Sequence, residues 1–348
     1  MRAVLALAAV LFAAAGARAQ ILPEGDCAGV YWDLTADFAS GDRVYARVLV
    51  TRAGPGDLNA AGMGYWISPD RITTRFQNGR GEGEFEWSEA GDRVRIGSTR
   101  LDVGADGISF EVDNDKRGVK LRVAIPARRE ASTAPVFAGD PAVDVLALGL
   151  AASGHVWRSG MAQPREVRGT ATLLRTRHGA CEPERSALRV DVHRLAPDDA
   201  SLLIHERLAD GTQRSWLGWH RARGPLRTLR PATVVLEDWR AEREGQAIPH
   251  RLRVSDRALS GTIAIGATQL SVDPLDALPR IVRMLYWFGA RPRRIWADAT
   301  SELASSGSDA LPRGAAIASF SILRPLETSR QETRAESRAQ RAAGERRP

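Results

Sequence analysis

Strand-like sequence in the middle of the chain carries a carboxylate and two imidazoles at spacings that suit acid–base chemistry. Asp191 and His193 lie in ALRVDVHRL, and His205 lies in the SLLIHERLA that follows. A carboxylate beside an imidazole can exchange a proton with it, and burial of such a pair shifts both pKa values. We therefore predict that Asp191 and His205 are the catalytic residues of any reaction carried out here.

Turn signals predict how these strands pair. Asp210-Gly211 is typical of a two-residue hairpin turn, which places His205 opposite Trp216. The longer turn between the first two strands places His205 across from Asp191. Since directly opposed residues share a face, we expect one face to carry Asp191, His193, His205 and Trp216.

That face has two possible surroundings. Arginines at positions 189, 207 and 214 share it, and a row of charges in front of aliphatic residues is typical of a solvated outer surface. The alternative is a polar barrel interior, where the aspartate–histidine pair would have shifted pKa values. In that interior His193 and Trp216 would be ligand-binding residues.

A short polar stretch, RTRHGACEPER, precedes these strands. Arg175 and His178 in it could form part of an anion-binding, ligand-binding cluster, and a water-exposed loop is the alternative for the histidine. Cys27 and Cys181 are the chain's two cysteines. In an exported protein a single pair is a plausible disulfide, with two buried thiols as the alternative. The sequence lacks metal-ligand spacing, and we predict neither a metal nor a cofactor.

The opening residues, MRAVLALAAVLFAAAGARAQ, have the charged start, apolar centre and small-residue cleavage site of a secretory signal peptide. We expect 1–19 to be removed and the mature protein to be periplasmic or secreted; an uncleaved anchor is the alternative. The formal net charge is +7, but much of it lies in this segment and in the arginine-rich tail at 328–348, which we expect to be disordered. The remainder has no concentrated basic stripe with interleaved aromatic residues, which argues against a nucleic-acid partner.

Short alternating segments bounded by Gly, Asp or Pro run from 29 to 126 and resume after the polar, proline-containing stretch 127–142. Strands of this length and spacing predict antiparallel barrels or sandwiches. We therefore expect an N-terminal β domain at 27–128 and a C-terminal β domain at 143–326.

One segment of the second domain departs from the strand pattern. LDALPRIVRMLYWF, at 275–288, has the apolar periodicity of an amphipathic helix. A helix packed on the end of a barrel is one interpretation. The other is a lid or a docking helix that contacts a membrane surface or a membrane transporter through 275–294.

Three longer segments have counterparts in a known family. YWDLTADFASGDRVYARVLVT with EWSEAGDRVRIGSTRLDVG is similar to an aromatic-led hairpin and a later Trp-led strand pair. VRGTATLLRTRHGACEPERSALRVDVHR is similar to a strand that runs into Asp-x-Asn-x-Gly and then a Trp-x-Trp strand. LSVDPLDALPRIVRMLYWFGARPRR is similar to a strand that passes into an amphipathic helix. Together these segments resemble the carotenoid 1,2-hydratase (hydroxyneurosporene synthase) family and the AttH-like, lipocalin-like superfamily around it.

The resemblance implies an all-β, mainly antiparallel fold with two tandem lipocalin-like β-barrel domains and one short amphipathic helix near the C-terminus. It also implies chemistry without cofactor or metal, in which the terminal C=C of an isoprenoid is protonated and water captures the carbocation. Such a reaction requires a strong, positioned acid in an apolar pocket.

The family's acid position is altered in this chain. With the register anchored on Gly179, the family's Asp falls on Arg175 and its Asn falls on Arg177. Arginine cannot donate a proton at neutral pH, because its pKa is above about 12. We therefore predict an exported, non-catalytic protein that binds a hydrophobic small molecule, an isoprenoid or a lipid, in one barrel. The alternatives are a cofactor-free hydratase that uses Asp191 or His205 as its acid, and a periplasmic adaptor of a lipid transporter.

Overall fold

The structure is a computed structural model, and it describes the chain in segments. The described residues are 22–53, 57–88, 90, 92–126, 134–196, 199–221, 224–241, 246–274, 292–305, 311 and 313–323. The expected signal peptide at 1–19, the expected helix at 275–288 and the expected tail at 328–348 lie outside these residues.

The regular secondary structure of the described residues is almost entirely antiparallel β-strand, which confirms the expected all-β class. The first sheet contains β1 (Gly29–Phe38), β2 (Arg43–Thr51), β3 (Asn59–Ile67), β4 (Thr73–Gly81), β5 (Glu86–Trp87), β6 (Arg93–Ile96), β7 (Thr99–Gly104), β8 (Gly107–Asn114), β9 (Val119–Pro126), β10 (Ala134–Phe137), β11 (Ala142–Arg158) and β12 (Arg165–His178). The second contains β13 (Ser186–Arg194), β14 (Asp199–Leu208), β15 (Gln213–Arg221), β16 (Arg227–Leu229), β17 (Thr233–Ala241), β18 (Ala247–Ser255), β19 (Leu259–Val272), β20 (Arg293–Ser305) and β21 (Gly314–Ile322). Two short helical turns, η1 (Asp115–Arg117) and α2 (Glu182–Arg185), interrupt the strands.

Each sheet curls so that its two edge strands are consecutive in the chain. The first sheet runs β4-β3-β2-β1-β12-β11-β9-β8-β7-β6-β5, and the second runs β16-β15-β14-β13-β21-β20-β19-β18-β17. Among the described strands, β4 does not pair with β5 and β16 does not pair with β17, so each meander is a barrel left open at one seam. Such curling buries one face of each sheet and leaves β4, β5, β16 and β17 as the edge strands.

The alternation of residue types explains which faces these strands bury. In β9, VKLRVAIP, the apolar residues are buried and the intervening ones are half-buried or exposed, as expected of a strand with one face on a core. In β13, SALRVDVHR, the first eight residues are buried on both faces. Apolar and polar residues alternate along most of β13, but residues of both kinds are buried.

The chain divides into two compact units. Unit 1 combines Met1–Arg128 with Ala151–Gly169 and Leu173–Ala180, and unit 2 holds Arg129–Leu150, Thr170–Thr172 and Cys181–Pro348. This division differs from the expected domains, because the second half of β11 and most of β12 belong to unit 1. The reason is hydrogen bonding: β12 is next to β1 in the sheet, and the end of β11 pairs with β9.

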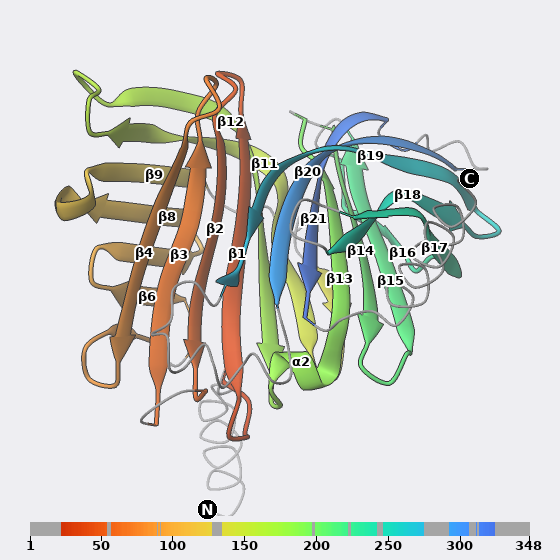
Figure 1. Cartoon of the computed structure of the whole chain (residues 1–348), viewed down its shortest axis with the longest axis horizontal. Coiled ribbons are helices and arrows are strands. Elements are labelled where there is room, and N and C mark those ends of the chain that lie inside the picture. Colours follow the sequence, from red (N-terminus) through yellow and green to blue (C-terminus); the bar gives the residue numbers. More distant parts are fainter. Residues whose placement is uncertain are drawn as a thin grey trace, which may run out of the picture. The chain divides into compact units, whose positions relative to one another are not determined.

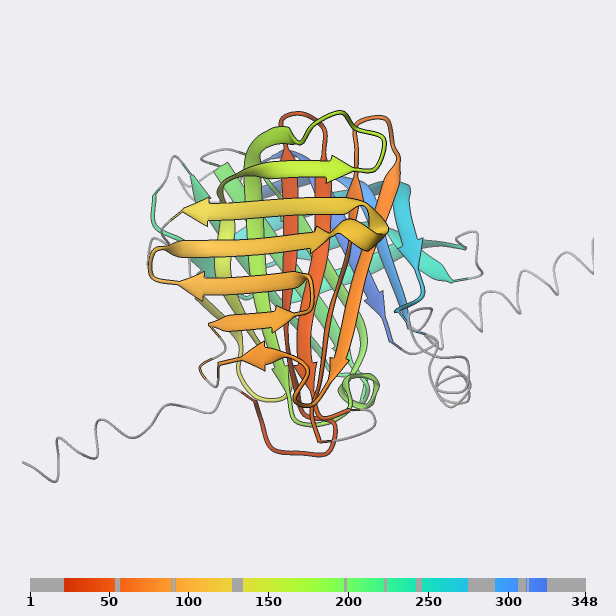
Figure 2. The ribbon, with the colours of Figure 1, turned by 90° about the vertical axis from the view of Figure 1, so that its left-hand side faces the viewer.

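Unit 1 packs its sheet against itself. Figure 2 shows β6 to β9 running across β1 to β4, with the two layers face to face. Phe76 of β4 contacts Phe110 of β8 with ring centroids 5.9 Å apart. Gly62 of β3 leaves the room that Thr99 of β7 occupies, since a Cβ there would lie 2.5 Å from the threonine methyl. These contacts join the two layers of unit 1.

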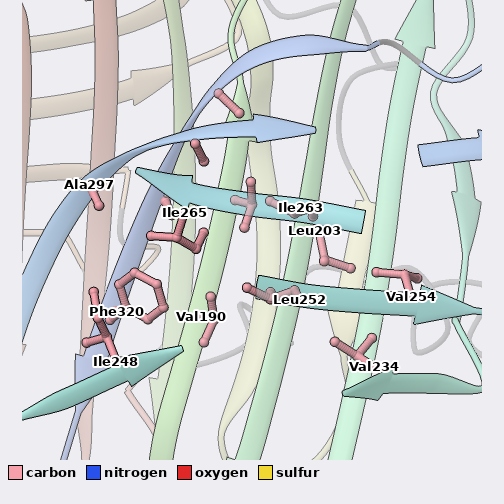
Figure 3. Packing of buried hydrophobic residues seen from close by; sticks show 14 of the residues in the cluster. Val190, Leu203, Val234, Ile248, Leu252, Val254, Ile263, Ile265, Ala297 and Phe320 are labelled. Atoms are coloured by element: carbon pink, nitrogen blue, oxygen red, sulfur yellow. The ribbon is translucent and has the colours of Figure 1, made fainter. Parts of the chain in front are cut away.

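Unit 2 packs in the same way. In Figure 1, β13, β14 and β15 are neighbouring strands, and Figure 3 shows β18 and β19 crossing them with apolar side chains directed into the space between. Val190 and Leu203 come from one layer and Leu252 and Ile263 from the other. We call the side of the sheet that carries this buried cluster the inner face of unit 2.

Candidate functional site

The pairing of β13, β14 and β15 differs from the expected register by one residue at each hairpin. His205 lies opposite Val190 on β13 and opposite Ser215 on β15. The predicted pairing of His205 with Asp191 and with Trp216 is therefore wrong. Because successive side chains of a strand point to opposite faces, a shift of one residue moves His205 away from both partners.

The second hairpin explains half of this error. Leu208 N donates to Thr212 O, so the loop has three residues rather than two. Gly211 has φ +87°, while Asp210 has no positive φ, and a two-residue type I′ turn would need both. Instead Asp210 Oδ1 accepts the Thr212 N–H at 2.8 Å, and this hydrogen bond lowers the pKa of the Asp210 carboxyl. In the first hairpin Arg194 pairs with Ser201, which lengthens that turn by one residue as well.

The four residues expected on one face are divided between two. Asp191 and Trp216 both lie opposite Ile204, so they share a face, and His193 follows on the same side of β13. His205 lies on the inner face, in register with Val190 and Ser215. The structure thus keeps Asp191, His193 and Trp216 together and separates the histidine of the predicted catalytic pair from them.

Neither face is a solvated outer surface. The relative exposure is 8% for Asp191, 3% for His193, 2% for Trp216 and 1% for His205. The expected solvent-facing row of charges is therefore wrong for this part of the sheet. Charged groups at these positions are inside the protein, where each must find a polar partner.

The face with Trp216 is covered within unit 2 by residues 136–149. His220 Nε2 lies 2.9 Å from Leu148 O, and Gly149 comes so close to Ala200 that a Cβ on the glycine would lie 2.1 Å from the alanine methyl. Further along, the Arg214 guanidinium donates to Pro141 O at 2.7 Å and lies 4.3 Å from the centre of the Phe137 ring. β10 and the first half of β11 thus cover this face.

Asp191 forms an ion pair with Arg189, two residues before it on the same strand. Arg189 Nε donates to Asp191 Oδ1 at 2.8 Å, and both side chains are nearly buried. A carboxylate in such a pair is stabilised in its charged form. Asp191 is therefore an ion-pair partner of Arg189, on the face opposite to His205.

His205 is a titratable group on the inner face whose pKa is lowered by burial. Burial lowers the pKa of His205 to about 4, from an ordinary value of 6.5, because the apolar surroundings disfavour the charged imidazolium. Its Nδ1 lies 2.9 Å from Ser215 Oγ, which is the cross-strand neighbour. At neutral pH the imidazole is uncharged, so it can share a hydrogen bond or accept a proton but cannot act as a strong acid.

Three cross-strand rows describe the inner face from β13 to the edge strand β16. The first row holds Val190, His205 and Ser215; the second holds Val192, Leu203, Leu217 and Leu229; the third holds Arg194, Ser201, Trp219 and Arg227. Hydrogen-bonding groups thus lie in the first and third rows, on either side of a fully apolar second row.

The apolar side chains that are only half-buried come from strands at or next to the two edges of the second sheet, on either side of its open seam. Trp219 and Leu229 come from β15 and β16, and Leu236 and Trp239 come from β17. All four pack against the buried cluster while still meeting solvent. In β17, Asp238 has φ +54°, a left-handed conformation that breaks the strand alternation next to Trp239. The sequence analysis did not predict this set, because two tryptophans and two leucines spread over three strands give no local signal of a shared site.

The remaining ligand-binding candidates lie in unit 1. Arg175 is half-buried and His178 is buried, both on β12, so the expected exposed loop is wrong for the histidine. His178 Nδ1 lies 2.8 Å from Ala180 O, and its ring lies 5.9 Å from that of Tyr31. Gly29 makes this packing possible, since a Cβ there would lie 2.6 Å from His178 Nε2. His178 therefore packs on the start of β1.

The two cysteines are both disulfide-bonded. Within the described residues, no group of three or more His, Cys, Asp or Glu side chains is arranged to hold a metal ion. No helix of the described segments is long and apolar enough to cross a membrane.

No protein-family model matches this sequence, and no curated protein shows significant sequence similarity to it. Solved structures do match. An AttH-like protein of Nitrosomonas europaea superposes with a TM-score of 0.61 at 15% identity, covering 85% of this chain and 93% of the other. CghA solved with Sch210972 gives a TM-score of 0.55 at 12% identity over 86% and 90% of the two chains.

A third match is kievitone hydratase from Nectria haematococca. Its TM-score is 0.51 at 8% identity, and the superposition covers 88% of this chain and 95% of the other. At these identities the likeness concerns the arrangement of strands. The chain therefore shares its fold with an AttH-like protein, with CghA and with a hydratase.

Proposed function

We propose that the protein binds a hydrophobic small molecule, an isoprenoid or a lipid, on the inner face of unit 2 and carries out no reaction on it. The observation that carries this proposal is the seam between β16 and β17. There Trp219, Leu229, Leu236 and Trp239 pack against the buried cluster and remain half-exposed. These side chains extend the apolar core to a surface that is in contact with water. A ligand that covers this apolar surface is stabilised by about 25 cal/mol for each Å² removed from water.

His205 supplies the polar contact that such a ligand needs. It is uncharged at neutral pH and lies beside Ser215, whose side chain is half-buried. Ligand sites of this kind are mostly apolar with a few placed hydrogen-bonding groups. The low pKa of His205 and the arginine bound to Asp191 both argue against a strong acid, and this supports a binding role over protonation of a double bond.

We further propose that the chain is an exported, divergent member of the AttH-like superfamily. The shared fold with the Nitrosomonas europaea protein supports membership, and the disulfide-bonded cysteines support an oxidising compartment.

A second candidate function is cofactor-free water addition to a carbon–carbon double bond. The fold shared with kievitone hydratase favours it. In that case the neutral His205 would take a proton from the water whose oxygen bonds to one carbon, and would return that proton to the other carbon, so that H and OH are both added. Formation of a product that carries oxygen from labelled water would support this candidate over binding alone.

The test of the binding proposal is native mass spectrometry of the mature protein after incubation with a membrane lipid extract. We expect a one-to-one non-covalent adduct whose released ligand is an unchanged isoprenoid or lipid. Leu229→Glu places a charge among the seam residues and should abolish the adduct. Thr228→Glu is the matched control, because Thr228 is on the same strand, exposed and on the opposite face. A protein that stays free of any adduct would refute the proposal.

A further inference from the structure

We propose that unit 1 is completed by a hairpin from the second half of the chain, and that its other strands keep their fold only while this hairpin is docked. The hairpin consists of the end of β11 and the start of β12, Ala151–Gly169, and we call it the closing hairpin. Residues 22–126 and 134–323 are then partners that stay bound to each other when the chain between them is cut.

The strands of 22–126 form two groups that do not pair with each other. One group is β1 to β4 and the other is β5 to β9, and the sheet order β1-β12-β11-β9 places the hairpin between them. Among the described strands, β4 and β5 are the outer edges and do not pair. Removal of the hairpin would leave unpaired N–H and C=O groups along β1 and β9. Since β1 is mostly buried on both faces, such groups would be costly there.

The first side of the closing hairpin pairs with β9. The ladder runs from Ser153 opposite Ala124 to Arg158 opposite Val119, and Figure 2 shows the hairpin beside β9 in the layer of β6 to β9. The approach is so close that a Cβ on Gly154 would lie 1.7 Å from the carbonyl oxygen of the residue at position 122. Glycine is therefore required at this point of the ladder.

The second side of the closing hairpin lies against β1. β12 is the neighbour of β1 in the sheet, and Ala39 N, just after β1, donates to Arg168 O at 2.9 Å. A Cβ on Gly169 would lie 2.1 Å from Asp37 O, so this contact also depends on a glycine. The hairpin thus has one close backbone contact with each of the two strand groups.

Two arginines of the closing hairpin add side-chain contacts to residues of 22–126. The Arg165 guanidinium donates to Oδ1 of the fully buried Asp42. Arg158 donates from Nη1 to Ser68 Oγ at 3.2 Å and from Nη2 to Asp70 Oδ2 at 3.1 Å. Strand pairing on two edges together with these contacts is a form of β-augmentation, in which backbone hydrogen bonds supply affinity. It does not require a continuous chain between the two pieces.

The test cuts the folded full-length chain. A recognition sequence for a site-specific protease is inserted between Glu130 and Ala131, which lie outside the described residues. The Cys27→Ser, Cys181→Ser variant is used, because the disulfide would otherwise hold the pieces together. Native mass spectrometry should show a one-to-one complex of the two pieces. If this variant does not fold, the oxidised protein is cut first and then reduced. Pieces that appear only separately would overturn the inference.

Gly154→Ala tests whether the closing hairpin carries the association. Its methyl group would force β11 away from β9, so the cut pieces should bind about tenfold more weakly. Amide hydrogen exchange should become faster in both β1 and β9 and stay unchanged in β18. Gly79→Ala is the matched control, because nothing lies within 4 Å of a Cβ there. Unchanged association, or faster exchange confined to β9, would show that the other strands of unit 1 hold their fold without the hairpin.

Discussion

His205 Nδ1 and Ser215 Oγ lie 2.9 Å apart on directly opposed positions of β14 and β15, with the imidazole on the apolar inner face of unit 2. The serine hydroxyl is the hydrogen-bond partner that makes burial of the ring tolerable. The pair is a neutral polar group within an apolar surface, which is the role that the binding proposal assigns to it.

The low pKa of His205 predicts a specific dependence of stability on pH. Its folded-state pKa is about 4 against 6.5 when unfolded, so between these values the unfolded chain binds the proton and the folded chain does not. The free energy of unfolding should therefore fall as the pH is lowered from 6.5 to 4, by about 3 kcal/mol from this group at most. Urea titrations of wild type and His205→Gln at pH 7, 6, 5 and 4 measure it. The advantage of wild type should shrink toward pH 4, and parallel curves for the two proteins would contradict the prediction.

Gly218 is required by the ring of Trp216. A Cβ at Gly218 would lie 2.1 Å from Trp216 Cη2. Gly218→Ala should therefore lower the free energy of unfolding by about 1–3 kcal/mol, because the buried indole has to shift. Gly79→Ala is the control, since nothing lies within 4 Å of a Cβ there. Equal effects of the two substitutions in thermal unfolding would show that the indole does not occupy this space.

Asp42 should be costly to remove, because it is a buried carboxylate with several donors. Its Oδ1 accepts from Trp66 Nε1 at 2.7 Å and from the Arg165 guanidinium, and its Oδ2 accepts from Ser40 Oγ at 2.6 Å. Asp42→Leu should cost about 3–5 kcal/mol, since it leaves a buried indole N–H and a guanidinium without this acceptor.

Asp70 provides the comparison, because its carboxylate is 57% exposed in its pair with Arg158. Asp70→Ala should cost less than about 1 kcal/mol in the same chemical denaturation experiment. If Asp42→Leu were as mild as Asp70→Ala, the buried carboxylate would contribute nothing to unit 1.

The disulfide should matter for stability. A cross-link between Cys27 and Cys181 closes a loop of about 150 residues, and loss of such a link is worth about 4–5 kcal/mol in the chain-entropy description. The double variant Cys27→Ser with Cys181→Ser should melt well below the oxidised wild type. Reduced wild type should melt close to the variant. Identical melting of oxidised and reduced wild type would contradict the prediction.

Much of the strand content could be predicted from the sequence. Alternation of apolar and polar residues and the regular Gly, Asp and Pro turns identify segments such as β9 and β13 with little ambiguity, because a period of two is a property of the strand itself. The three segments that resemble the hydratase family led to a fold that the AttH-like structure shares.

The candidate site was predicted less well, and the cause is specific. Asp-Gly suits a two-residue turn and also a three-residue loop with glycine in the left-handed position, and only the folded chain shows that Asp210-Gly211 uses the second. One residue of difference moves His205 from the face of Asp191 to the inner face.

The sequence alone therefore determined that this is an antiparallel β protein and which residues could carry chemistry. Tertiary structure decided which of those residues meet, because the period of two is the same in either register and loop geometry selects between them. Tertiary structure also decided the environment of these residues. The sequence pattern favoured a solvent-exposed row for Arg189, Asp191 and His193, but all three are buried because both faces of β13 are packed. The half-buried residues of β15, β16 and β17 pack on one buried cluster only when the sheet curls, since contacts of that kind depend on where distant strands lie and leave no local pattern.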